Sequence, residues 1–87
     1  MKAYLIIFEG PDYKEIIRRI KESGYWAKIA ENSFAVISDE TSSNIRTNLY
    51  QNLNVNKIYV VNITNCGWSS YGLSKEVTDW LKSNLKQ

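Results

Sequence analysis

Two acidic residues lie where the sequence predicts that a strand turns into a helix. Glu9 directly follows the apolar run Ala3 to Phe8, and Asp12 follows Pro11. Carboxylate oxygens are ligands for Mg²⁺, and a carboxylate can also act as a general base. One interpretation is therefore a metal or general-base site at Glu9 and Asp12, completed by symmetry in a dimer. The structural alternative is that acids at a helix N-terminus favour the helix dipole, with Asp12 in the first turn.

A stripe of basic side chains follows on the predicted helix. Lys14, Arg18 and Lys21 recur at i, i+4 and i+7, which places them on one side of a helix. Such a stripe is suited to contact the phosphate backbone of RNA or DNA. The alternative is a solvated face, which Glu15 and Arg19 would support as an i, i+4 pair in the favourable order.

A loop predicted over residues 64–73 carries the remaining candidates, namely Cys66, Trp68 and Tyr71. Two aromatic side chains and a thiol could stack on a base or receive a protein partner. The alternative is that Trp68 and Tyr71 fold back on the core. A nucleophilic role for Cys66 is disfavoured, because the chain contains no histidine to activate the thiol.

Composition limits the functions that the 87 residues can support. A chain of this length forms a single domain, residues 1–87, with a modest core that a dimer would supplement. The net charge of +2 is too small to indicate nucleic-acid binding by itself. The single cysteine excludes an intramolecular disulfide and predicts a cytoplasmic protein. No apolar run approaches the roughly 20 residues that a membrane span requires, so no membrane association is expected.

The elements that position these residues follow from hydrophobic spacing. The nearly all-apolar run 3–8 predicts a central strand that is buried on both faces. Tyr13, Ile16, Ile17 and Ile20 predict a helix with one apolar face, closed by Gly24 as a C-cap. The further predicted elements are a hairpin of strands 25–30 and 34–38, a helix over 43–53, a strand over 57–63 and a last helix capped by Ser74.

This order, β-α-β-β-α-β plus a C-terminal helix, predicts an α+β fold of the ferredoxin-like type. The expected architecture is a four-stranded antiparallel sheet with helices on one face and strand order 4-1-3-2. The fourth strand is apolar enough to be expected inside the sheet, beside the first. Its outer edge would then be covered by the C-terminal segment or by a second subunit.

Several short motifs carry a resemblance that spans nearly the whole chain. They are Tyr4-Leu5-Ile6, Trp26, Trp68-Ser69-Ser70-Tyr71-Gly72-Leu73-Ser74 and Asp79-Trp80-Leu81-Lys82-Ser83-Asn84-Leu85. In these the chain resembles the SinR-family proteins, a sister group of the small CRISPR-associated metal-dependent nucleases of the second Cas family. Both groups are structurally similar to VapD. The resemblance implies a ferredoxin-like fold, a homodimer and an association with nucleic acid.

The chain departs from the nuclease pattern at one position. Where those nucleases carry an aspartate after the first strand, this chain carries Glu9. The resemblance implies that this residue from two subunits would hold Mg²⁺ or Mn²⁺ across the dimer axis, and the longer side chain displaces the oxygens. Two hypotheses follow. The first is a nucleic-acid-associated protein with a degenerate metal-dependent nuclease site. The second is a non-catalytic interaction module, such as an inhibitor, an antitoxin-like partner or a regulator.

Overall fold

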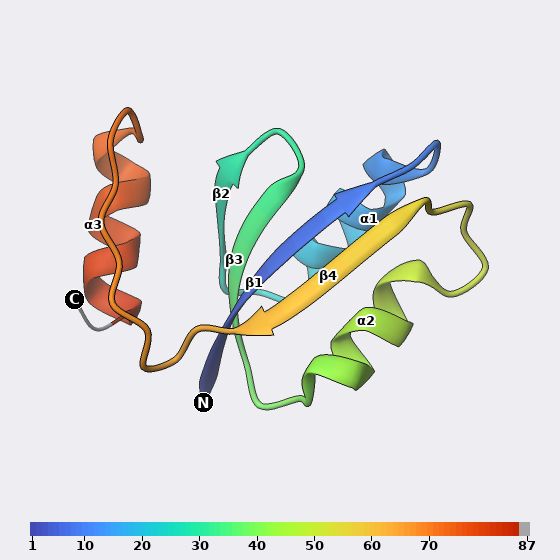
Figure 1. Cartoon of the computed structure of the whole chain (residues 1–87), viewed down its shortest axis with the longest axis horizontal. Coiled ribbons are helices and arrows are strands. Elements are labelled where there is room, and N and C mark those ends of the chain that lie inside the picture. The colour runs from blue at the N-terminus through green and yellow to red at the C-terminus, as the bar shows by residue number, and fades with distance from the viewer. Residues whose placement is uncertain (86–87) are drawn as a thin grey trace.

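The strands of the chain form one antiparallel sheet. A computed structural model describes residues 1–85. In chain order the elements are β1 (Lys2–Glu9), α1 (Tyr13–Glu22), β2 (Trp26–Ala30), β3 (Ser33–Ser38), α2 (Ser42–Tyr50), β4 (Lys57–Asn62) and α3 (Lys75–Asn84). The strand order is β2-β3-β1-β4, so β1 and β3 lie in the centre (Figure 1). The predicted α+β class with a four-stranded antiparallel sheet is confirmed.

Strand β1 extends one residue beyond each end of the predicted run, so Glu9 is its last residue. Tyr4, Ile6 and Phe8 point to one face and are almost completely buried. Ile7 points to the other face and is 41% exposed. The prediction that this strand is buried on both faces is therefore wrong for its C-terminal half, where no element covers the second face.

The main core lies between the sheet and helices α1 and α2. The aromatic rings of Phe8 and Phe34 stack there with their centroids 6.1 Å apart. The other buried members of this cluster are Tyr4, Ile6, Ile16, Ile20, Val36, Ile45 and Leu49. Each fully buried large side chain contributes about 1.5–3 kcal/mol, so this cluster fixes both helices on the sheet.

Helix α3 packs on the opposite face of the sheet. Its Leu81, together with Leu85, contacts Ala3 and Ala35 in a second, smaller cluster. The helix lies next to β2, away from β4 (Figure 1). The expectation that the two helices of the ferredoxin-like plan share one face is confirmed for α1 and α2. The alternative in which the C-terminal segment covers the edge of the fourth strand is wrong, because α3 lies next to β2.

Strand β4 forms one edge of the sheet, and β2 forms the other. The prediction that β4 lies inside the sheet is therefore wrong for the single chain. Its largely apolar sequence resembles that of a central strand, which explains the error. Strand β2 carries a register irregularity between Lys28 and Ala30, whereas β4 pairs with β1 without interruption from Lys57 to Asn62.

The ends of α1 and α3 follow the predicted capping residues closely. Ser23 is the C-cap of α1, and Gly24 follows it with a φ of +112°, a value that glycine adopts without a Cβ penalty. Gly24 was predicted to be the C-cap itself, whereas the observed cap lies one position earlier, at Ser23. Ser74 caps α3 by accepting a hydrogen bond from the Val77 N–H at 3.2 Å, as predicted.

Helix α2 is shorter than the predicted span 43–53. Thr41 caps its start, since the threonine Oγ1 accepts a hydrogen bond from the Asn44 N–H at 3.1 Å. The helix ends at Tyr50, and Asn52 adopts a left-handed conformation with a φ of 64°.

Within residues 1–85, no helix is long and apolar enough to span a membrane.

Candidate functional site

Glu9 lies at the exposed end of β1, directly opposite Lys57 of β4. The Lys57 Nζ atom is 3.7 Å from the Glu9 Oε2 atom, and both side chains are exposed. Because side chains alternate along a strand, Glu9 points to the same face as Ile7. The carboxylate is therefore a solvated partner in a cross-strand ion pair, on the side of the sheet opposite the main core.

Asp12 serves to hold the strand-to-helix corner in place. Its carboxylate accepts a hydrogen bond from the Asn54 N–H at 2.7 Å, while its own N–H donates to the Asn54 carbonyl at 3.2 Å. No side-chain hydrogen bond from Asp12 caps α1. The residue is the N-cap of α1 and lies outside the first turn where it was predicted. Its carboxylate is thus committed to the loop that precedes β4.

Gly10 shows how closely this corner approaches the same loop. A Cβ atom on Gly10 would lie 2.8 Å from the Val55 Cα atom and 2.9 Å from the Asn56 N atom. The Asn56 N–H also donates to the Glu9 carbonyl at 2.8 Å. The corner between Glu9 and Asp12 is therefore closely packed against the loop before β4 and hydrogen-bonded to it. Such packing indicates a structural role for this corner.

The metal hypothesis places its ligands at this corner. Among residues 1–85, no three Cys, Asp or Glu side chains come close enough together to hold a metal ion. Asp12 is engaged by Asn54, so one chain offers Glu9 alone, and that carboxylate faces Lys57. A Mg²⁺ or Mn²⁺ site would require a second chain, and it stays a prediction.

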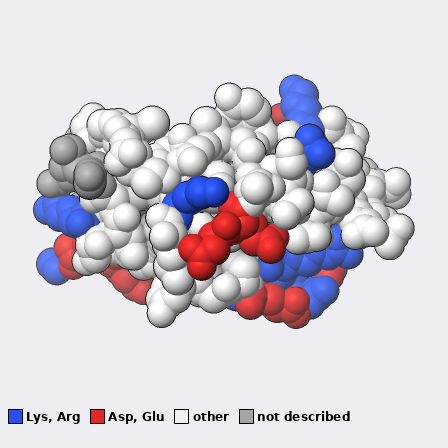
Figure 2. Space-filling view, turned by 90° about the horizontal axis from the view of Figure 1, so that it is seen from below, with Lys and Arg blue, Asp and Glu red and all other residues white. Residues whose placement is uncertain are grey.

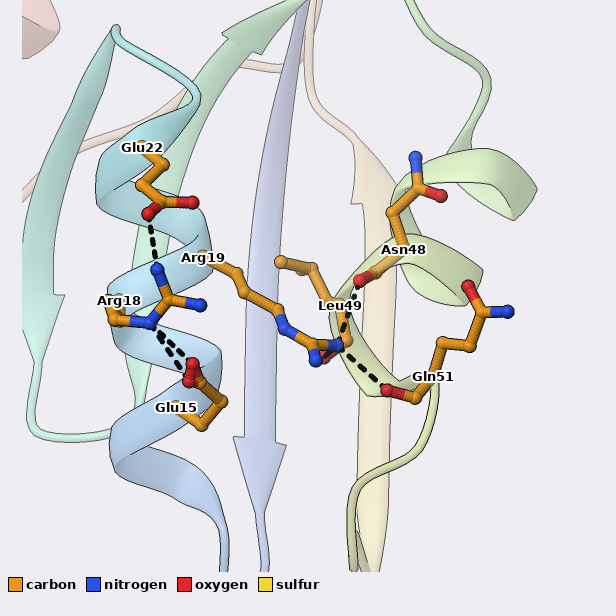
Figure 3. Close-up of polar contacts among 7 residues, drawn as sticks. All are labelled: Glu15, Arg18, Arg19, Glu22, Asn48, Leu49 and Gln51. Carbon is orange, nitrogen blue, oxygen red and sulfur yellow. Dashed lines mark hydrogen bonds and ion pairs between the residues drawn. The ribbon is translucent and has the colours of Figure 1, made fainter.

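The predicted basic stripe on α1 is interrupted by acidic partners. Arg18 binds Glu15 on one side and Glu22 on the other (Figure 3). These contacts, above all the hydrogen bond with Glu15, raise the pKa of Arg18. Lys14 and Lys21 each lie near an aromatic ring, 6.0 and 5.0 Å from the ring centroids. Charges of both signs are also interspersed on the face shown in Figure 2. Nucleic-acid binding through this stripe stays a prediction.

Arg19 performs a role that the sequence reasoning missed. Its Nη1 atom lies 3.2, 3.3 and 2.9 Å from the carbonyl oxygens of Asn48, Leu49 and Gln51, at the C-terminal end of α2 (Figure 3). These carbonyls have no partner inside the helix, so the guanidinium caps α2 from the neighbouring helix. Glu15, the partner predicted for Arg19, binds Arg18 instead.

The three candidates in the loop before α3 have separate environments. Trp68 packs against the smaller core cluster, as the structural alternative predicted. Tyr71 is fully exposed, so its predicted return to the core is wrong. Cys66 is an exposed free thiol. An open groove of about 380 Å³ runs between this loop, α3 and the sheet, with Leu5 on its floor.

An apolar patch remains on the part of the second face that α3 leaves uncovered. Ile7 of β1 and Tyr59 of β4 are directly opposite in the register and are 41% and 61% exposed. Half-buried Leu5 and Val61 form the next pair. We call these four residues the β1–β4 patch. Lys57, Tyr59 and Val61 are alternate residues of β4 and therefore share one face. A lysine on the same face as these apolar residues was the sequence signal that this face is exposed.

Two open hollows lie on the other side of β4, beside α2. One has a volume of about 210 Å³ and is lined by Ser42, Ser43, Arg46 and residues 58–60. The other has a volume of about 340 Å³ and is lined by Tyr50, Leu53 and residues 55–58. They share Ile58, and we refer to them together as the α2–β4 groove. No sequence reasoning anticipated the groove, because it depends on how α2 lies relative to β4.

Comparison of the chain with models of known protein families, with curated proteins and with solved structures finds no match.

Proposed function

We propose that the protein is a small interaction module that forms a homodimer through the β1–β4 patch. The observation that carries the proposal is the exposure of Ile7 and Tyr59 side by side on the sheet. Exposed contiguous apolar surface of this kind is typical of an interface.

The charges at the end of the patch favour a second copy as the occupant. Glu9 and Lys57 are an opposite-charge pair next to Ile7 and Tyr59. Across a two-fold axis, Glu9 of one copy can pair with Lys57 of the other, which makes the surface self-complementary. If the residues at the end of the patch carried charges of one sign only, they would repel the same residues of a second copy.

The fold that we propose for this module is ferredoxin-like. The order β4-β1-β3-β2, with α1 and α2 on one face, supports this assignment. An exposed free cysteine also fits a protein of the reducing cytoplasm, which we propose as its location.

The test is the oligomeric state of matched tyrosine variants. Tyr59→Asp removes an aromatic contact and introduces a charge at the proposed interface. Tyr25→Asp is the control, because Tyr25 is 62% exposed, close to the 61% of Tyr59, but lies outside the patch. In the proposed dimer, burial of the Tyr59 side chain contributes about 1–2 kcal/mol per subunit to the free energy of association, and Tyr59→Asp removes this contribution.

Sedimentation equilibrium should give a dimer for wild type and for Tyr25→Asp, and a monomer for Tyr59→Asp. Thermal unfolding of each variant establishes that it is folded. A wild-type monomer at all concentrations would contradict the proposal, and so would a folded Tyr59→Asp variant that remains dimeric.

A second candidate function is the nucleic-acid association that the family resemblance implies. It is favoured by one observation, namely that Glu9 points to the same face as the β1–β4 patch. In the proposed dimer, the two Glu9 carboxylates would approach the seam and could share a divalent ion. The test is RNA and DNA cleavage with Mg²⁺ or Mn²⁺, by wild type and Glu9→Ala. Cleavage that persists in the variant would exclude Glu9 as the site.

A further inference from the structure

The outer edge of β4 carries backbone groups that are free to bind another strand. The Ile63 N–H donates to the Ala3 carbonyl at 2.8 Å. In an antiparallel ladder, hydrogen-bonded and non-hydrogen-bonded pairs alternate. The continuous register therefore turns the peptide groups of Val61 and Tyr59 toward β1. It turns those of Ile58 and Val60 away from β1, and no partner binds these groups within residues 1–85.

Other edge strands are commonly protected by a bulge, a proline or an inward-pointing charge. Strand β2 has such a device in the irregularity between Lys28 and Ala30. Strand β4, with the sequence KIYVVN, is regular and contains no proline. Its only charged residue is Lys57, at its first position. The strand itself thus carries no such device over residues 58–62, and helix α2 lies beside it.

The α2–β4 groove lies along this same edge. Because its two hollows share Ile58, they follow one another along the strand. In an added strand, alternate side chains point to the same face, about 7 Å apart. Those directed toward α2 would enter the hollows, one near Arg46 and another near Leu53. An edge strand flanked by a helix thus combines backbone pairing with pockets for alternate side chains.

The charge in the groove indicates what kind of strand fits. Arg46 lines the first hollow, and its one hydrogen bond within residues 1–85 is a long contact of 3.5 Å to the Thr47 hydroxyl. No carboxylate pairs with it among those residues. A second copy of β4 contains no acidic residue and would bring Lys57 instead. The complement to Arg46 is therefore an acidic side chain from a different sequence.

We propose that β4 accepts an extended peptide segment of a partner protein as a fifth, antiparallel strand. The segment places apolar side chains in the α2–β4 groove and an aspartate or glutamate beside Arg46. This site and the β1–β4 patch share only Tyr59, which lines one hollow, whereas Leu5, Ile7 and Val61 of the patch lie outside the groove. Peptide binding thus does not depend on the proposed homodimer.

The experiment begins with a displayed library of random eight-residue peptides. Selection on the wild-type chain should enrich alternating apolar residues with an acidic residue, and the enriched peptide is then synthesised. Val60→Pro removes an outward N–H without breaking the ladder to β1 and should weaken binding about tenfold or more. Arg46→Glu should weaken binding similarly, whereas Lys14→Glu, an exposed charge reversal on α1, should leave it unchanged.

Two measurements keep the test independent of how well Val60→Pro folds. N-methylation of alternate peptide residues should abolish binding to the wild-type chain. By NMR, the amides of Ile58 and Val60 should exchange rapidly in the free chain and become protected when the peptide is bound. Folded, monomeric Ile7→Asp should retain peptide binding, which separates this proposal from the dimer, because Ile7 belongs to the β1–β4 patch and does not line the α2–β4 groove.

Three results would overturn the proposal. The first is a selection without enrichment. The second is a selected peptide whose affinity is unchanged by Arg46→Glu and by N-methylation. The third is protection of the Ile58 and Val60 amides in the chain alone at high concentration, because a second copy would then occupy the edge.

Discussion

Arg19 should contribute far more to stability than its neighbour Arg18, although only Arg18 forms ion pairs. Arg19→Met keeps the apolar stem and removes the guanidinium that caps α2. The Nη1 atom carries two N–H groups, so it satisfies at most two of the three nearby carbonyls at once. We therefore count two hydrogen bonds rather than three, each contributing about 0.5–1.5 kcal/mol.

The favourable charge at the helix C-terminus adds about 0.3–1 kcal/mol. The expected loss for Arg19→Met is therefore about 1.3–4 kcal/mol, which lowers the melting temperature by at least about 5 °C in a domain of this size. Arg18→Met is the matched control. It removes exposed ion pairs with Glu15 and Glu22, and such pairs contribute little.

Urea denaturation followed by tryptophan fluorescence measures both variants. Raising the salt concentration should shrink the effect of Arg18→Met, because salt screens exposed charge pairs, and should change that of Arg19→Met much less. If Arg19→Met destabilises the protein no more than Arg18→Met does, the inference that Arg19 holds α2 against α1 is refuted.

Three further substitutions test other contacts. Gly10→Ala should destabilise the fold by about 2–5 kcal/mol, because the new Cβ atom meets the Val55 backbone at 2.8 Å; a melting temperature close to that of wild type would contradict this packing. Ser74→Ala should cost about 1 kcal/mol through loss of the α3 cap, measured by urea denaturation. Lys75 lowers the pKa of Asp79, chiefly through its hydrogen bond, so this carboxylate stabilises the fold above the unfolded pKa of about 4. The stability difference between wild type and Asp79→Asn should therefore be full at neutral pH and disappear as the pH falls through the lowered pKa; a constant difference down to pH 2 would exclude the pair as its cause.

The strands and helices that the sequence predicted well are those with strong local signals. The apolar spacing of α1 and the serine before α3 both depend on neighbours within a few residues. The fourth strand was correctly placed beside the first, but it was assigned to the interior of the sheet because a central strand and an edge strand can have the same composition, and only the tertiary arrangement distinguishes them. Ile7 was expected to be buried because the apolar run of β1 does not show which face of the strand other elements leave uncovered.

The candidate site depends even more on contacts between distant residues. The structural alternative predicted for Asp12 was a place in the first helical turn, whereas its carboxylate binds the N–H of Asn54, which lies 42 positions away. Arg19 was predicted to pair with Glu15 because the i, i+4 rule considers only residues of the same helix. The rule cannot predict a contact with the carbonyl oxygens of a second helix. The groove beside β4 likewise has no local sequence signal.

The unequal edges of the sheet have a consequence for assembly. The irregularity between Lys28 and Ala30 in β2 disfavours lateral addition on one side, whereas β4 carries no such irregularity on the other. A chain with two open edges could polymerise without limit into a fibril. This chain can receive a strand on one side only, so lateral growth ends after a single partner segment has been added, and mixtures with the partner should give discrete complexes instead of filaments.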